Sequence, residues 1–175
     1  MLSTILIILS GAFALLIIVG IFLPSKISFE RNLSINADKK IIFSYLENLK
    51  QWETWSAWST QNDASIIFTF PEKYFGTGAI MQWKGKKLGA GRMEILKSNP
   101  NQQLEMQLMF NNSGFRIYYF FTLKDIGGST HVQWEAIGKM RRIGIAKIIA
   151  LMLPKWMGRD MEIGLKILKQ TAEKK

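Results

Sequence analysis

Few residues of this chain have the type and spacing that catalysis or metal binding requires. The sequence contains no cysteine and a single histidine. A thiolate site, a conventional zinc site and a histidine-dependent triad are therefore improbable. His131 alternates with Val132 and Trp134 in a predicted strand, so its side chain is expected on the solvent-facing side rather than in a cavity as a general base. We predict no catalytic residue and no metal site.

Short glycine motifs do not indicate a nucleotide cofactor. The pairs at 76–78 and 89–91 lack the third glycine of a dinucleotide fingerprint, and each precedes a strand where that fingerprint requires a helix. Gly85 and Lys86 are followed by Lys87 instead of the serine or threonine of a P-loop. These glycines are expected to bend and connect strands. We predict no cofactor.

Polar groups on the apolar faces of the predicted elements are few. Tyr119, Tyr45 and Arg31 are the ones that the alternation places inward. Acid–base chemistry in a cavity needs a carboxylate or histidine within hydrogen-bond reach of the substrate, and the apolar faces supply almost none. For Arg31 a structural ion pair is the simpler interpretation, and contact with an anionic headgroup is the alternative.

The elements that position these residues follow from apolar periodicity. Residues 27–35 alternate as a half-buried strand, and residues 36–38 can cap a helix that continues to about residue 49. Trp52, Trp55 and Trp58 recur every third residue on one side of a short helical turn. Six alternating segments joined by short, turn-rich loops then predict an antiparallel meander, centred near residues 68, 81, 93, 107, 120 and 134. The chain closes with a long helix whose apolar stripe comprises Met157, Met161, Leu165, Leu168 and Ala172.

The amino-terminal segment is predicted to be a transmembrane anchor. Residues 2–23 carry no charged side chain, and as a helix they would extend about 33 Å. A cleaved signal peptide is the alternative, but the first basic residue, Lys26, follows the apolar run instead of preceding it. Basic residues exceed acidic ones in 24–43, which favours a single-pass protein with its soluble domain on the cytoplasmic side.

The predicted fold class is α+β. One long carboxy-terminal helix covers the apolar face of a curved antiparallel sheet, and a transmembrane helix precedes this two-layer domain. We expect a boundary between an anchor at 1–25 and a single domain at 26–175.

The order of several short motifs resembles the SRPBCC superfamily, also called START-like or polyketide cyclase/dehydrase-like. The motifs are Leu23 to Lys26, Ile35 to Ala37, the tryptophans of 52–58, the glycines of 76–91 with Trp83, Val132 with Trp134, and Gly164 to Lys169. The resemblance implies a helix-grip fold, in which the sheet wraps around the carboxy-terminal helix. It also implies a deep hydrophobic cavity that binds lipids, sterols, polyketides or quinones, and a few members are cyclases or dehydratases.

Aromatic and methionine side chains are expected to line this cavity. Pockets lined by aromatic groups with few polar atoms suit apolar ligands, and methionine adapts to varied shapes. For any one of these residues, simple core filling is an equally good interpretation. The predicted lining comprises Trp55, Trp83, Met93, Met106, Tyr119, Phe121, Trp134 and Met161.

A second apolar stretch, at 143–153, is too short to span a bilayer but has basic, tryptophan-bearing flanks. We expect it to lie on the membrane at the cavity mouth, and the alternative is that it packs inside the domain as part of the helical cap. The predicted membrane contacts are Arg141, Arg142, Lys147, Lys155 and Trp156.

These observations favour a membrane-anchored, non-catalytic protein that binds a hydrophobic small molecule or lipid. A cyclase- or aromatase-like enzyme acting on a polyketide-type substrate is the main alternative. The pI near 9.9 could indicate nucleic-acid or ribosome binding, but the sequence has no recognition motif and no nucleic acid is expected. An interaction domain whose cavity is filled by its own side chains also remains open, and the sequence does not predict the oligomeric state.

Overall fold

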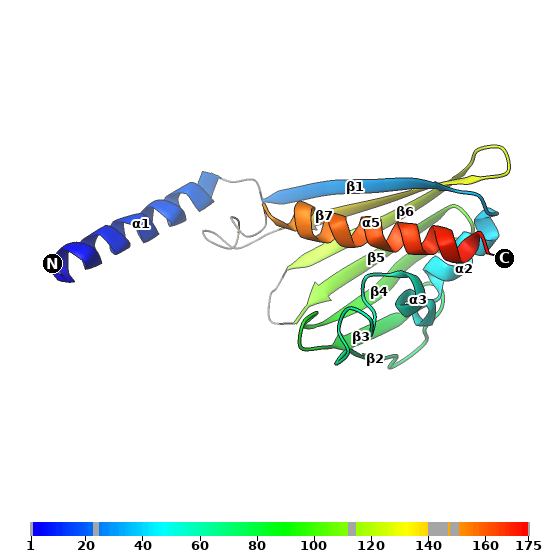
Figure 1. The fold of residues 1–175 in the computed structure, drawn as a ribbon, viewed down its shortest axis with the longest axis horizontal. Coiled ribbons are helices and arrows are strands. Elements are labelled where there is room, and N and C mark those ends of the chain that lie inside the picture. The colour runs from blue at the N-terminus through cyan, green and yellow to red at the C-terminus, as the bar shows by residue number, and fades with distance from the viewer. Residues whose placement is uncertain (1, 23–24, 112–114, 140–146, 148–150, 175) are drawn as a thin grey trace.

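The computed structural model describes residues 2–22, 25–111, 115–139, 147 and 151–174 (Figure 1). Within these residues the strands form one antiparallel sheet of seven, in the order β1-β7-β6-β5-β4-β3-β2. The helices are α1 (Leu2–Phe22), α2 (Lys39–Glu47), the 3-10 turn η1 (Leu49–Gln51), α3 (Trp52–Trp55) and α5 (Leu153–Ala172). The strands are β1 (Lys26–Ile35), β2 (Ile67–Thr69), β3 (Ile80–Lys84), β4 (Ala90–Asn99), β5 (Gln103–Phe110), β6 (Arg116–Asp125) and β7 (Thr130–Lys139). The predicted helix-grip arrangement and the predicted meander are confirmed.

β1 pairs with β7, the last strand of the meander, and not with β2, the next strand along the chain. It pairs with β7 in continuous register from Lys26 opposite Lys139 to Ile35 opposite Thr130. The side chains of β4 to β7 alternate between buried and half-exposed positions. One face of the sheet therefore carries the apolar core, as period-two alternation requires.

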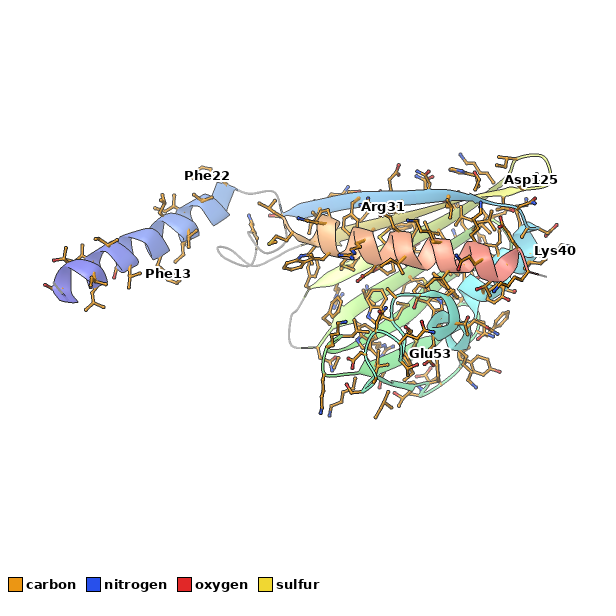
Figure 2. The ribbon with its side chains drawn as sticks, in the orientation of Figure 1. Phe13, Phe22, Arg31, Lys40, Glu53 and Asp125 are labelled. Atoms are coloured by element: carbon orange, nitrogen blue, oxygen red, sulfur yellow. The ribbon has the colours of Figure 1, made fainter. Side chains whose placement is uncertain are left out.

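α5 packs along the inner side of β1 (Figure 1). The Lys169 Nζ donates to the Ser34 carbonyl at 3.0 Å, and the Arg31 Nε donates to the Glu162 Oε1 at 2.5 Å. Figure 2 shows Arg31 on β1 beside α5. A β-carbon at Gly158 would lie 2.9 Å from the Arg31 Cζ, so the absence of a side chain there lets the guanidinium approach the helix. The ion-pair interpretation of Arg31 is confirmed.

The core beneath α5 is dominated by aromatic rings. Trp52 and Trp55 pack with ring centroids 4.6 Å apart, and Trp134 lies 4.7 Å from Phe121 and 5.8 Å from Trp55. Such pairs add about 0.5–1.5 kcal/mol each beyond the area they bury. Trp58 packs outside this cluster, against Trp83, with the two ring centroids 6.1 Å apart. The tryptophan tract therefore supplies two separate parts of the core.

The prediction of a transmembrane anchor is wrong. α1 extends away from the sheet (Figure 1), and its large apolar side chains, such as Ile7 and Phe13, are exposed. A membrane-spanning helix must be both long and apolar. Among the residues that the structure describes, no helix is long and apolar enough to cross a membrane. The predicted single-pass location, with a cytoplasmic domain, is wrong for the same reason.

The predicted membrane-contact segment falls mostly where the structure gives no description. Arg141 and Arg142 lie outside the described residues. Lys147 is buried, at 8% exposure, whereas Lys155 and Trp156 are exposed. Contact of these residues with a bilayer stays a prediction. The transmembrane anchor that was expected to hold them near a bilayer is no longer part of it.

Candidate functional site

A groove of about 680 Å³ lies where α5 faces the β3–β4 hairpin and the loop after α3. Small-molecule sites typically have volumes of about 300–1,000 Å³. Leu88, one of its lining residues, also packs against the apolar core. α5 contributes Trp156, Arg159, Asp160 and Ile163, the hairpin contributes Lys87 and Leu88, and the loop contributes Ala57 and Asn62.

The hairpin side of the groove is fixed by one buried carboxylate. The Asp63 Oδ2 accepts hydrogen bonds from the backbone N–H groups of Lys87 and Leu88, at 2.8 and 2.9 Å. The Asp63 Oδ1 accepts from the backbone and hydroxyl of Ser65, at 3.0 and 2.6 Å. A β-carbon at Gly85 would collide with this carboxylate, so the hairpin closes around it only because residue 85 is glycine. Asp63 thereby holds the two hairpin residues that line the groove.

These hydrogen bonds stabilise the charged form of Asp63. The Ser65 hydroxyl contributes most, followed by the Leu88 amide, and together the bonds hold the pKa of the Asp63 carboxyl far below its ordinary value. The hairpin is therefore anchored by a carboxylate that stays ionised well into the acidic range.

Asp160 is a carboxylate within the apolar stripe of α5. It lies three residues after Met157 and four before Gly164, both buried, so helical spacing places it on the face that packs against the sheet. Its side chain is half-buried and lines the groove. Within the described part of the chain, no hydrogen bond or ion pair joins the side chain of Asp160 to another residue. Buried carboxylates are normally paired, so an unpaired one is a candidate for ligand contact.

Two cations stand near this carboxylate at the groove. Partial burial raises the pKa of the Asp160 carboxyl above its ordinary value, and the positive charges of Arg159 and Lys87 oppose that rise. Burial is the larger influence. The groove therefore combines an unpaired acid, two basic side chains and the exposed ring of Trp156.

Tyr119, on β6, is the second unpaired polar group of this region. Its ring is fully buried, and its hydroxyl has no hydrogen-bond partner among the described residues. Burial raises the pKa of the Tyr119 hydroxyl well above its ordinary value, and the negative charge of Asp160 adds to the shift. The Nε1 of Trp134, whose ring lies 5.2 Å from that of Tyr119, is likewise buried without a partner among these residues. An unmet buried donor costs about 1–3 kcal/mol, so two of them on neighbouring rings are unusual for a closed core.

The eight side chains predicted to line a cavity are all buried. Trp55, Tyr119, Phe121 and Trp134 contact one another beneath α5. The other four are Trp83, Met93, Met106 and Met161, which belong to the same apolar core. None of the eight lines the groove, whereas Trp156, predicted as a membrane contact, does. The structure thus places the predicted residues behind the groove.

Two further hollows lie along the strands. One, of about 640 Å³, is lined by polar residues of β3 and β4 such as Gln82 and Arg92, and also by Trp83, one of the eight predicted residues. The other, of about 210 Å³, is lined by Glu105 and Thr122, and also by Phe121, another of the eight. Neither hollow shares a lining residue with the groove. These hollows are therefore separate from the groove.

Asp160, Lys87 and Arg159 were not predicted as site residues. A signal for Asp160 was present, because an acid interrupts the apolar stripe between Met157 and Gly164. No pattern in the neighbouring sequence identified Lys87. It lines the groove only once the β3–β4 hairpin has folded against α5, which is distant in the sequence. For metal binding, no group of three or more acidic or histidine side chains comes together among the residues described.

Comparison with known proteins identifies the fold through structure alone. No protein-family model and no curated protein matches the sequence. Protein CV1439 from Chromobacterium violaceum aligns with a TM-score of 0.61 at 15% identity, over 86% of this chain and 99% of its own. Ara h 8.0201 aligns with a TM-score of 0.55 at 10% identity, over 82% and 98% of the two chains. StfQ, a di-domain ARO/CYC protein from the steffimycin biosynthetic pathway, aligns with a TM-score of 0.64 at 10% identity, over 85% of this chain and 51% of its own.

These alignments extend over most of this chain but at low identity. Similarity at this level establishes a shared fold and leaves function to the site itself. The fold is that of a helix-grip domain, with the long helix α5 held against the sheet.

Proposed function

We propose that residues 26–175 form a non-catalytic domain of the SRPBCC superfamily that binds a hydrophobic small molecule or lipid in the groove beside α5. The observation that carries this proposal is the groove itself, which has the volume of a ligand site and adjoins a core of aromatic rings. The helix-grip fold, shared with Ara h 8.0201 and StfQ, supports it.

The proposed ligand lies between Trp156 and Ile163 on α5 and Leu88 on the hairpin. These side chains offer apolar surface, and apolar burial contributes about 25 cal/mol per Å² removed from water. We further propose that the eight buried residues named above form the inner wall of the site, where the flexible side chain of Met161 adjusts to the ligand.

A cyclase- or aromatase-like enzyme acting on a polyketide-type substrate is a second candidate. One observation favours it: the unpaired carboxylate of Asp160 is close enough to Tyr119 for its charge to affect the tyrosine hydroxyl. Acid–base catalysis often uses groups whose pKa values are displaced by burial and by neighbouring charges. On this alternative, Asp160 is the group that exchanges a proton with substrate.

The binding proposal is tested by filling the groove. Ile163→Trp places a large ring in the groove, and Thr69→Trp places the same ring in the hollow on the opposite face. Full-length protein purified from its host is examined by native mass spectrometry and lipid extraction. An apolar molecule should accompany the wild type and Thr69→Trp but be lost from Ile163→Trp. Equal retention by both variants, or no bound molecule in the wild type, contradicts the proposal.

A further inference from the structure

Both walls of the groove beside α5 combine an exposed cation with a more buried apolar side chain. On α5, Arg159 and Ile163 are four residues apart, so they share one face of the helix, and both line the groove. Arg159 is exposed, whereas Ile163 is half-buried. On the facing hairpin, Lys87 is exposed and Leu88, the next residue, is half-buried. The groove is therefore cationic toward solvent and apolar toward the protein.

The acids that could neutralise these cations have other partners. On the hairpin side, the Asp63 carboxylate is occupied by the hydrogen bonds described above. Glu162, three residues after Arg159 on α5, forms an ion pair with Arg31 on β1. Among the described residues, no hydrogen bond or ion pair joins the Lys87 ammonium or the Arg159 guanidinium to an acid. Both cations are thus available to a ligand.

Asp160 does not cancel the positive charge of the groove. It is the single acid among the described residues that line the groove, against the two cations. The groove therefore keeps a net positive charge even when Asp160 is ionised. Burial already raises the pKa of the Asp160 carboxyl, and a second negative charge beside it would further favour its neutral form.

The donors and charges of the groove define a complementary ligand group. Ammonium and guanidinium groups only donate hydrogen bonds, so they need an acceptor. Their hydrogen bonds to a carboxylate or phosphate oxygen are roughly twice as strong as bonds between neutral groups. A ligand ammonium group would instead be repelled by both Lys87 and Arg159. An acidic headgroup on an apolar body matches the cationic and the apolar parts of the groove together.

We propose that Lys87 and Arg159 bind the acidic headgroup, a carboxylate or a phosphate, of an apolar anion. The apolar body of the ligand then lies against Trp156, Ile163 and Leu88. This inference rests on the proposed function, because it specifies the ligand class of the same groove.

The test compares three probes that share one naphthalene ring. 2-Naphthol is neutral near pH 7, 2-naphthoate carries a carboxylate, and 2-naphthyl phosphate carries a phosphate. Each is titrated into the full-length protein by calorimetry. At physiological ionic strength, at least one anion should bind about tenfold more tightly than 2-naphthol, and the tighter anion identifies the headgroup. This preference should largely disappear in about 1 M salt, where charges are screened within about 3 Å.

Charge variants give effects of opposite sign. Lys87→Gln and Arg159→Gln should each weaken anion binding about two- to fivefold, the range for exposed ion pairs, and leave 2-naphthol affinity unchanged. Asp160→Asn should strengthen anion binding by a similar factor, because it removes the opposing charge. Lys86→Gln is the matched control: it removes the same charge from the same hairpin, but Lys86 is not among the described residues that line the groove. It should change anion affinity by less than about twofold. Thermal unfolding verifies that each variant is folded.

The outcomes distinguish the two proposals. If all three probes bind equally and Ile163→Trp abolishes their binding, groove binding stands and the anion site is refuted. If Lys86→Gln weakens the anions as much as Lys87→Gln and Arg159→Gln do, the attraction is not specific to the groove and the anion site is also refuted. If no probe binds the wild type, both proposals are contradicted.

Discussion

Replacing Gly91 by alanine provides a stringent test of how the hairpin packs beside the groove. Gly91 is buried on β4, opposite Trp83 on β3 and Phe110 on β5. An added β-carbon would lie 2.5 Å from the Met109 carbonyl oxygen and 2.5 Å from the Cη2 of Trp83. Ordinary contacts begin near 3.4 Å, so the methyl group overlaps a backbone atom and an aromatic ring by roughly 1 Å.

Neither neighbour can move freely. The Met109 oxygen belongs to the sheet backbone, and Trp83 is held between Trp58 and Phe110, at 6.1 and 5.7 Å. The Trp83 Nε1 also donates to the Leu88 carbonyl at 3.3 Å. Overpacking of this kind costs about 1–3 kcal/mol, and replacing glycine within a strand returns about 0.5–1 kcal/mol. We expect Gly91→Ala to lower the free energy of unfolding by about 1–2 kcal/mol, which corresponds to about 2–8 °C in Tm.

Gly164→Ala is the matched control for this substitution. Its β-carbon would lie 3.5 Å from the rings of Trp134 and Trp55, which is ordinary van der Waals contact. Alanine is favoured over glycine in a helix interior by about 1 kcal/mol, so this variant should be more stable than wild type. Both are measured by urea unfolding and thermal circular dichroism. Equal effects of the two substitutions, or a stabilised Gly91→Ala, would refute the packing described for β3 and β4.

Three further predictions concern the charged and polar groups. Burial raises the pKa of Asp160, so its ionised form destabilises the folded state at neutral pH. Asp160→Asn should therefore increase Tm at pH 7. The gain should vanish below about pH 4, where the carboxyl is protonated in both the folded and the unfolded state. Because the pKa of Asp63 is lowered, its carboxylate stabilises the folded state at neutral pH, and this stabilisation is lost on acidification. Asp63→Asn should therefore lower Tm at pH 7 and flatten the dependence of stability on pH below about pH 4. It should also speed hydrogen exchange at the Leu88 amide, which loses its acceptor. Tyr119→Phe removes an unpartnered hydroxyl and should leave the free energy of unfolding unchanged or raise it by up to about 1 kcal/mol in urea titrations; a loss above that size would indicate a hidden partner.

The regular elements were predictable because their side chains repeat with the period of the backbone. β1 alternates from Lys26 to Ile35, and α5 buries the same apolar stripe that the sequence shows. Asp38 caps α2 as expected, since its side chain accepts from the Lys40 amide. Each of these signals depends only on neighbouring residues, so each can be recognised without knowledge of the tertiary fold.

The groove was not predictable in the same way. Lys87 and Asp160 are far apart in the sequence, and both line the groove, where Asp63 holds the hairpin through the Lys87 amide. The inward aromatic residues were identified correctly, but alternation could not show that Trp52, Trp55 and Trp134 fill the region beneath the helix. The groove therefore lies at a boundary between elements, which sequence periodicity does not describe.

The amino-terminal helix illustrates a different limit. The apolar run correctly predicted a helix, which the structure shows at Leu2–Phe22. The inference from an uncharged run to a membrane span was wrong, since no helix among the described residues is long and apolar enough to cross a membrane.

The most direct test of the central claim is to locate a bound probe on the protein. Amide chemical shifts of the full-length protein are recorded by NMR during titration with 2-naphthol. Binding in the groove predicts the largest changes at Leu88, Asp160 and Ile163, with little change at Thr69 and Gln82 on the opposite face. Changes centred on that opposite face, or no saturable change at the groove amides, would contradict the account.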